Sequence, residues 1–316
     1  MVMRISSQQI YRQGLTSLQK NQETVSRANL ELSSGYSVIT AGDDPAAATQ
    51  ASRISSKLAQ SSQYQRNNTS LNNSLSYEES VLDSVETSML RVQSLVTEAG
   101  NGALSDSDRE AIAKELEDRM TELQDLMNSK DSSGNYIFSG HATKTEPFTA
   151  DATSTTGYTT FSYQGDSGKT NIDISSYVSL AKNDPGDSVF TFDEVDADGN
   201  STGNSTNILN VVSETIDALR NSSGDDIDLS KYLNNVDAAY NTVLGTVSGI
   251  GARQNVADNV QATLEANDVS DTAQRASLVE ADYYEAVTNL TQSTSALQIA
   301  QASYVKIQGM SLFDYL

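Results

Sequence analysis

Apolar residues recur at helical spacing over two long stretches that contain neither glycine nor proline. One stretch lies between Pro45 and Gly100, and the other lies between Gly251 and Gly309. Because glycine and proline interrupt helices, and because these runs exceed ordinary globular helices, we expect long helices packed as in a coiled coil. The first stretch has a seam of alternating three- and four-residue spacing, which contains Tyr64, Asn68, Leu71, Leu75, Glu78, Leu82, Val85, Met89, Val92, Val96 and Ala99.

Capping patterns predict where two of the helices begin. Asp44 followed by Pro45 is typical of an N-cap and a first helical residue. The segment 107–110, Ser-Asp-Arg-Glu, predicts a capping box for a further helix, whose apolar face would contain Ile112, Leu116, Leu123 and Met127. A second seam runs from Leu233 to Leu264, and the polar segment 267–271 is expected to form a joint after it.

Each end of the chain carries one amphipathic helix that needs a partner. We expect the inner seams of these helices to be the assembly interface. Burying one apolar face stabilises such a helix less than ordering its backbone costs, so we expect both ends to be disordered in the monomer and to fold on assembly. An intramolecular helical hairpin is the alternative, and both can hold. The seam residues are Tyr11, Leu18, Val25, Leu32, Val279, Tyr283, Leu290, Leu297, Tyr304 and Ile307.

The middle of the chain has the two-residue period of half-buried strands. Phe161 with Tyr163, Ile172 with Ile174, and Phe190 with Phe192 form such pairs among polar residues. The loop 164–168 predicts a hairpin between the first two pairs. We therefore expect a mainly α fold: an elongated long-helix coiled-coil bundle formed by the N- and C-terminal segments, with a small β-rich insert. The expected domains are terminal helices (1–44 and 272–316), a helical bundle (45–140 and 207–271) and the insert (141–206).

Composition excludes most catalytic and metal-binding chemistry. The chain has no cysteine and one histidine, His141, so thiolate sites, cysteine nucleophiles and imidazole clusters are not expected. The acidic run 194–199 matches the first half of a calcium loop, but Ser205 occupies the position of the bidentate glutamate, which favours an acidic turn. We expect neither an enzyme nor a cofactor.

Charge separates the ends of the chain from its middle. The chain has 42 acidic and 20 basic residues and a net charge of -22, which opposes binding to nucleic acid or to anionic membranes. Residues 1–44 hold four basic and four acidic side chains, and residues 272–316 hold two and four, so nearly all of the charge lies between them. No apolar run is typical of a cleaved signal peptide or a membrane span, which leaves a cytoplasmic protein or export by another route.

Several motifs resemble those of the bacterial flagellin superfamily. They are Leu-Ser-Ser-Gly at 32–35 with Asp-Asp-Pro-Ala-Ala at 43–47, Gly-Ala-Arg-Gln-Asn at 251–255 and Glu-Ala-Asp-Tyr-Tyr at 280–284. The segments 3–6, 134–140, 163–166 and 311–316 are more similar to the hook-filament junction members of that superfamily than to flagellin itself.

This resemblance implies a rod with terminal helices in the axial core of the flagellum, a bundle outside them and the insert outermost. It also implies a ring of copies that joins hook-associated protein 1 to flagellin. The location would be the extracellular flagellum, reached by type III export without a cleaved signal peptide, with a cytoplasmic chaperone on the C-terminal helix. The alternatives are flagellin, which is the bulk filament subunit, and a non-flagellar secreted coiled-coil protein.

Overall fold

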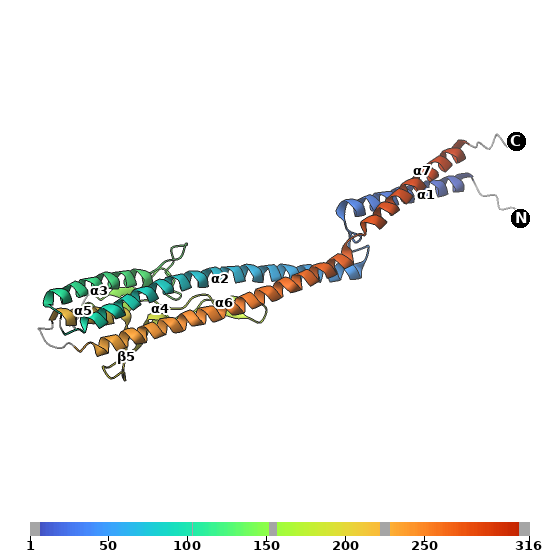
Figure 1. Cartoon of the computed structure of the whole chain (residues 1–316). Coiled ribbons are helices and arrows are strands. Elements are labelled where there is room, and N and C mark those ends of the chain that lie inside the picture. Colours follow the sequence, from blue (N-terminus) through green and yellow to red (C-terminus); the bar gives the residue numbers. More distant parts are fainter. Residues whose placement is uncertain (1–6, 103, 152–156, 222–227, 310–316) are drawn as a thin grey trace, which may run out of the picture. The chain divides into compact units, whose positions relative to one another are not determined.

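The computed structural model describes residues 7–102, 104–151, 157–221 and 228–309, and this part of the chain is mainly α-helical (Figure 1). The motif segments 3–6 and 311–316 lie outside it. The expected order of helices, a small strand-containing middle region and further helices is confirmed. The helices are α1 (Ser7–Ser34), α2 (Pro45–Ala99), α3 (Asp106–Met127), α4 (Gly186–Phe190), α5 (Ile208–Asn221), α6 (Ser230–Val279) and α7 (Tyr283–Gly309).

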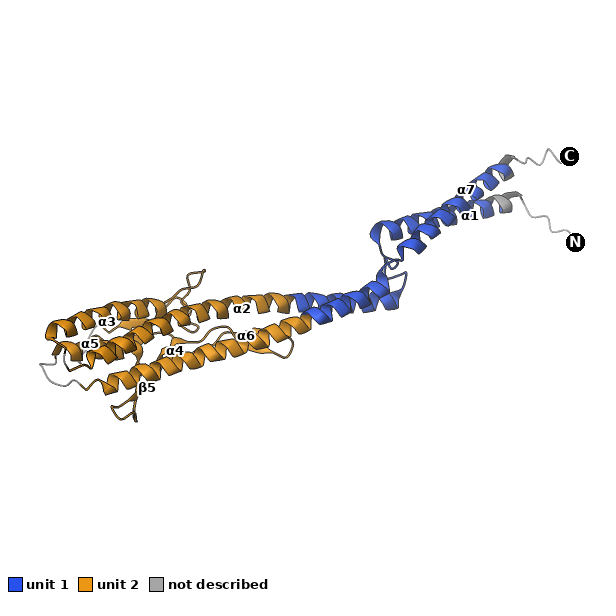
Figure 2. Cartoon of the chain, in the orientation of Figure 1, with its two compact units in different colours: residues 1–62, 265–316 blue, residues 63–264 orange. Residues whose placement is uncertain are grey.

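The chain divides into two compact units (Figure 2). One contains residues 1–62 and 265–316, and the other contains residues 63–264. Helices α2 and α6 each contribute residues to both units. The three-domain division expected from the sequence stays a prediction.

Helix α2 begins at Pro45 and ends just before Gly100, as the positions of proline and glycine predicted. The Asp44 carboxylate accepts hydrogen bonds from the amides of Ala46 and Ala47, both at 2.9 Å, so it is the expected N-cap. Every residue of the predicted seam is buried except Tyr64, which is half-buried. The two polar members, Asn68 and Glu78, are therefore core residues.

Helix α3 begins two residues earlier than the capping pattern suggested. Ser105 is the N-cap: its hydroxyl accepts from the amide of Asp108 at 3.3 Å, and the Asp108 carboxylate accepts from the amide of Ser105 at 3.1 Å. The predicted box at 107–110 was thus wrong in register, because Ser107 lies inside the first turn. Ile112, Leu116, Leu123 and Met127 are buried as expected.

Helix α6 continues through the segment that was expected to form a joint. Residues 267–271 are helical, and the buried Asp271 carboxylate forms an ion pair with Lys57 at 2.9 Å. That contact offsets the weak helix propensity of the Asn and Asp side chains. The helix instead ends at Val279, just before the segment 280–282.

Within the described residues, the strands form three separate two-stranded antiparallel sheets. The pairs are β1 (Phe148–Ala150) with β2 (Phe161–Tyr163), β3 (Asn171–Asp173) with β4 (Ser179–Ala181), and β5 (Thr191–Val195) with β6 (Ser201–Asn207).

The hairpin predicted between the second and third strands was therefore wrong. The Asp166 carboxylate accepts from the amides of His141 and Gly168, both at 2.8 Å, and this holds the loop 164–168 against the segment around His141 instead of letting it reverse the chain. His141 is an exposed turn residue. Phe190, expected in a strand, ends the short helix α4, and its ring packs edge-on against Phe138 with centroids 4.9 Å apart.

Candidate assembly surface

Helices α1 and α7 lie side by side and run antiparallel (Figure 1). Small residues bring them close together. Ala28 on α1 and Ala286 on α7 are buried, and a Cβ atom added to Gly14 would lie 3.1 Å from the ring of Tyr304. The intramolecular hairpin is therefore the arrangement seen in this structure.

Most of the predicted seam residues lie along this helix pair. Leu18, Val25 and Leu32 on α1 are half-buried, and so are Leu290, Leu297 and Tyr304 on α7. The side chains of Tyr11 and Ile307 fall outside the described part of the chain. The role of all these residues at an interface between subunits stays a prediction.

Two predicted seam residues do not contribute to the packing of α1 against α7. Val279 is buried but belongs to the last turn of α6. Tyr283 is 71% exposed and does not line the intramolecular seam. The physical reason is the break at 280–282, which interrupts the three- and four-residue spacing that the sequence pattern carried through from α6.

A second apolar face of α7 was missed by the sequence analysis. At about 100° per residue, Tyr284 and Ile299 lie about 160° and 140° around the helix from the buried Ala286. Tyr284 is 83% exposed and Ile299 is 67% exposed. Together with Val287 and Val305, which are also exposed, they form what we call the outer α7 face. Its signal in the sequence is a set of apolar residues that lie off the seam.

This second face leaves apolar surface on α7 that α1 does not cover. An amphipathic surface helix has one apolar stripe, whereas a helix with apolar residues on opposite sides is typically buried on both. On α1, Leu15 and Leu30 are likewise exposed. The helix pair therefore presents apolar surface on α1 and on α7 that a neighbouring chain can cover.

The segments that connect the helix pair to α2 and α6 are hydrogen-bonded to each other. Gly35 ends α1 with a φ of 75°, a left-handed conformation that glycine adopts without strain. Its carbonyl accepts from the amide of Ala281 at 2.9 Å, and the amide of Ser37 donates to the carbonyl of Val279 at 2.9 Å. Two of the motifs that carry the family resemblance thus meet at this point.

Three aspartates shape the same connection, of which Asp44 is the N-cap of α2 described above. The Asp43 carboxylate accepts from the amides of Thr40 at 2.8 Å and Ile39 at 3.1 Å, and it pairs with Arg27 of α1 at 2.9 Å. Hydrogen bonds from Thr40, followed by the Arg27 charge, lower the pKa of Asp43. Asp282 caps α7 by accepting from the amide of Tyr284 at 2.9 Å.

The remaining C-terminal motif holds the insert against α6. Arg253 donates to the carbonyl of Ala181 at 3.1 Å and pairs with the buried Asp184, which also contacts Lys169 at 3.0 Å. The amide of Asp184 donates to the buried Glu78 of α2 at 3.2 Å. Burial, and then the charge of Asp184, raises the pKa of Glu78 to about 8.

The acidic run 194–199 covers the last two residues of β5 and most of the turn that leads to β6. The Asp196 carboxylate accepts from the amides of Asp198 at 3.0 Å and Asn200 at 2.8 Å, while Glu194 pairs with Lys231 at 2.9 Å. Among the described residues, no group of three or more His, Cys, Asp or Glu side chains is placed to hold a metal ion. None of the described helices has the length and apolar character needed to cross a lipid bilayer.

Comparisons with known proteins give one consistent result. Residues 5–143 match the bacterial flagellin N-terminal helical region, and residues 233–316 match the bacterial flagellin C-terminal helical region. The chain is 29% identical to flagellar hook-associated protein 3 of Escherichia coli (strain K12) and 28% identical to that of Salmonella typhimurium, in each case over 99% of both chains.

Flagellins align over a smaller part. The phase 1 flagellin of Salmonella naestved is 31% identical over 39% of this chain and 24% of its own length. The fold is similar to that of the flagellar junction protein from Legionella pneumophila, with a TM-score of 0.60 and 18% identity over 73% of this chain and all of that chain.

Proposed function

The chain belongs to the bacterial flagellin superfamily, and from that premise we propose that it is the structural adaptor that joins the flagellar hook to the flagellin filament. The observation that carries the proposal is the extent of the alignments. Both hook-associated proteins 3 align over essentially the whole chain, whereas the Salmonella naestved flagellin aligns over 39% of it. The family is structural, and no catalytic step forms part of the proposal.

The two faces of α7 suggest how an adaptor of this kind would assemble. The inner face packs on α1 within one chain, and the outer α7 face is free to pack on neighbours. Head-to-tail contacts that do not close generate helical assemblies, and a subunit with one altered face can join two unlike polymers. In this proposal further copies of the chain lie beside it in a ring, hook-associated protein 1 lies on one side, and flagellin lies on the other.

The outer α7 face also suggests a binding partner before export. An exposed apolar helix face is a liability in the cytoplasm, and a chaperone on the C-terminal helix would cover it until export. We therefore place the chain in the extracellular flagellum, exported through the flagellar type III apparatus without a cleaved signal peptide.

Removal of residues 276–316 tests the adaptor function. In a motile bacterium that carries the gene, we expect the truncated chain to give hooks without attached filaments and flagellin free in the medium, because α7 and its outer face are lost. Electron microscopy and the flagellin content of the supernatant measure this, with the full-length chain as the control. Retained motility would contradict the adaptor function.

Flagellin is the second candidate, because the N- and C-terminal helical regions are shared with it. Its test is the addition of purified chain to filament seeds. Elongation into long filaments without added flagellin would favour a bulk filament subunit over an adaptor.

A further inference from the structure

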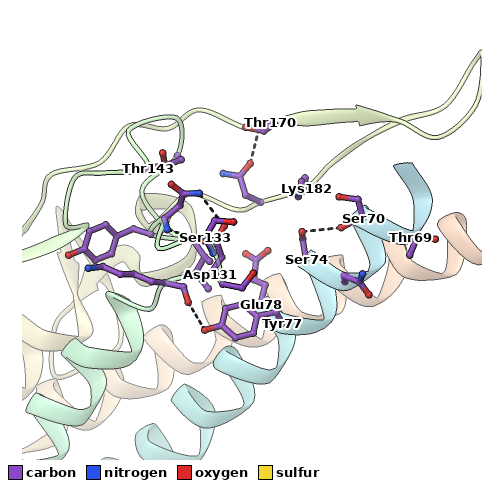
Figure 3. A pocket seen from close by; sticks show the side chains of 18 of the residues that line it. Thr69, Ser70, Ser74, Tyr77, Glu78, Asp131, Ser133, Thr143, Thr170 and Lys182 are labelled. Atoms are coloured by element: carbon purple, nitrogen blue, oxygen red, sulfur yellow. Dashed lines mark hydrogen bonds between the residues drawn. The ribbon is translucent and has the colours of Figure 1, made fainter. Parts of the chain in front are cut away.

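The segment 134–140, which the assembly surface does not use, forms one wall of an open cleft. The opposite wall is the middle of α2, and residues around β3 and β4 close the top (Figure 3). The cleft has a volume of about 930 Å³. Small-molecule sites typically measure about 300–1,000 Å³, so this cleft is large enough for a ligand of several rings.

The α2 wall is polar over several turns. Thr69, Ser70, Asn73, Ser74 and Tyr77 line it, and they lie beside the apolar seam of the same helix. Hydroxyl and amide groups both donate and accept hydrogen bonds, which suits a ligand that carries many hydroxyl groups.

The opposite wall is a tight turn that carries an aromatic ring and a cation. Lys130 and Tyr136 form an antiparallel bridge, and the Lys130 ammonium lies 4.5 Å from the centre of the Tyr136 ring. The hydroxyl of Tyr77 donates to the carbonyl of Lys130 at 2.8 Å and so ties the two walls together. Tyr77 and Tyr136 both line the cleft.

Positive charge predominates in this cleft, although the chain as a whole carries -22. Arg66, Lys130 and Lys182 line it, and within the described residues the Lys182 ammonium makes neither a hydrogen bond nor an ion pair. The Asp131 carboxylate accepts from the amides of Ser133 at 2.8 Å and Asn135 at 2.9 Å. Burial opposes its charge, but these hydrogen bonds and the nearby Lys182 charge lower its pKa, so Asp131 is one negative charge beside the three cations. The other acid is the buried Glu78, and its raised pKa keeps it largely uncharged at neutral pH.

We propose that this cleft binds an acidic saccharide. The sugar hydroxyls would meet the hydroxyl and amide groups of α2, a carboxylate or sulfate would meet Lys182 and Lys130, and the sugar rings would lie against the two tyrosines. A saccharide fits better than an acidic peptide because the lining consists mainly of hydroxyl, amide and charged groups, whereas peptides are held by apolar anchor pockets.

Calorimetric titration of the full chain with tetragalacturonate tests the proposal, with neutral maltotetraose, inorganic phosphate and hexa-aspartate as comparison ligands. Of these four ligands, we expect only tetragalacturonate to bind at millimolar concentrations. The double variant Lys130→Ala/Lys182→Ala should weaken this binding at least about tenfold, because it removes the charged donors. Lys114→Ala is the control for loss of a surface charge, since it removes one lysine charge from an exposed position on α3 and should change affinity by less than about twofold.

Four results would overturn the assignment. The first is no binding of tetragalacturonate, and the second is a loss of affinity in Lys114→Ala equal to that in the double variant. The third is an affinity for phosphate equal to that for tetragalacturonate, which indicates a simple anion site. The fourth is an affinity for hexa-aspartate equal to that for tetragalacturonate, which indicates a peptide site. Circular dichroism of each variant checks that the fold is unchanged, and the exposed position of Lys130 makes disruption by its substitution unexpected.

Discussion

At the scale of single residues, the polar members of the α2 seam carry information that apolar periodicity alone does not. Asn68 is buried and its side-chain NH2 group donates to the carbonyl of Ala257 at 2.7 Å, so the donor half of its amide is matched between α2 and α6. Glu78 is also buried, beside Asp184, Arg253 and Lys169. A carboxyl group in such a place favours its neutral form, which links the stability of the fold to pH.

Glu78→Gln should make stability less dependent on pH. The pKa of Glu78 in the folded protein is raised from 4.5 to about 8, so the folded state holds the proton more tightly than the unfolded state does. The contribution of Glu78 is therefore complete below pH 4.5 and is lost as pH rises through about 8, at up to about 1.4 kcal/mol per pH unit.

Urea unfolding of both proteins at several pH values between 5 and 8 measures this difference. The glutamine side chain keeps an oxygen that can accept from the amide of Asp184, so it is a conservative replacement. Parallel pH dependence of the two free energies of unfolding would show that Glu78 binds the same number of protons in both states, and hence that folding does not raise its pKa.

At the scale of elements, α7 has one apolar face that packs on α1 and a second apolar face that is exposed in the single chain. Its inner face meets α1 through Ala286, Leu290 and Leu297, while Tyr284 and Ile299 remain exposed on the other side. Burial of one large aliphatic side chain contributes about 1.5–3 kcal/mol. The outer face can thus stabilise contact with a second chain without altering the first contact.

Ile299→Ser and Leu297→Ser should separate these two contacts. We expect Ile299→Ser to leave the free energy of unfolding of the monomer within about 0.5 kcal/mol of its original value, and to weaken assembly with flagellin at least about tenfold. We expect Leu297→Ser to lower helix content in the monomer as well. Circular dichroism and sedimentation measure the two effects, and equal behaviour of the variants would contradict separate faces.

At the scale of the whole molecule, the two units differ in the core each one holds. The large buried side chains, from Leu71 to Ile250, belong to the unit of residues 63–264. In the other unit the buried apolar residues are mostly small, such as Ala28 and Ala286. The charge follows the same division, because the terminal segments are nearly neutral.

Hydrogen exchange on the dilute monomer should show the same difference between the two units. We expect amides of residues 286–304 to exchange much faster than those of residues 71–96, because local stability follows buried apolar contact. The same amides of α7 should become protected when the chain assembles. Full protection of residues 286–304 in the free monomer would contradict disorder of the ends before assembly.

Much of the helical framework could be predicted from the sequence because its signals are local. The absence of breakers and the N-cap at Asp44 set the bounds of α2, and the three- and four-residue spacing identified its buried face, including Glu78. The motifs at 32–35 and 280–284 likewise indicated the family. Each of these signals depends on residues within one or two helical turns.

Only the tertiary structure decided which segments meet. Strand β2 pairs with the preceding β1, and β3 pairs with the following β4, because Asp166 holds the loop that would otherwise have joined β2 and β3 as a hairpin. Helix α6 continues through 267–271, where Asp271 pairs with Lys57. The outer α7 face became visible once the inner face had been assigned, and the cleft depends on bringing Arg66, Tyr136 and Lys182 together. Periodicity records how residues repeat along one element, whereas pairing and cavities depend on contacts between residues far apart in the chain.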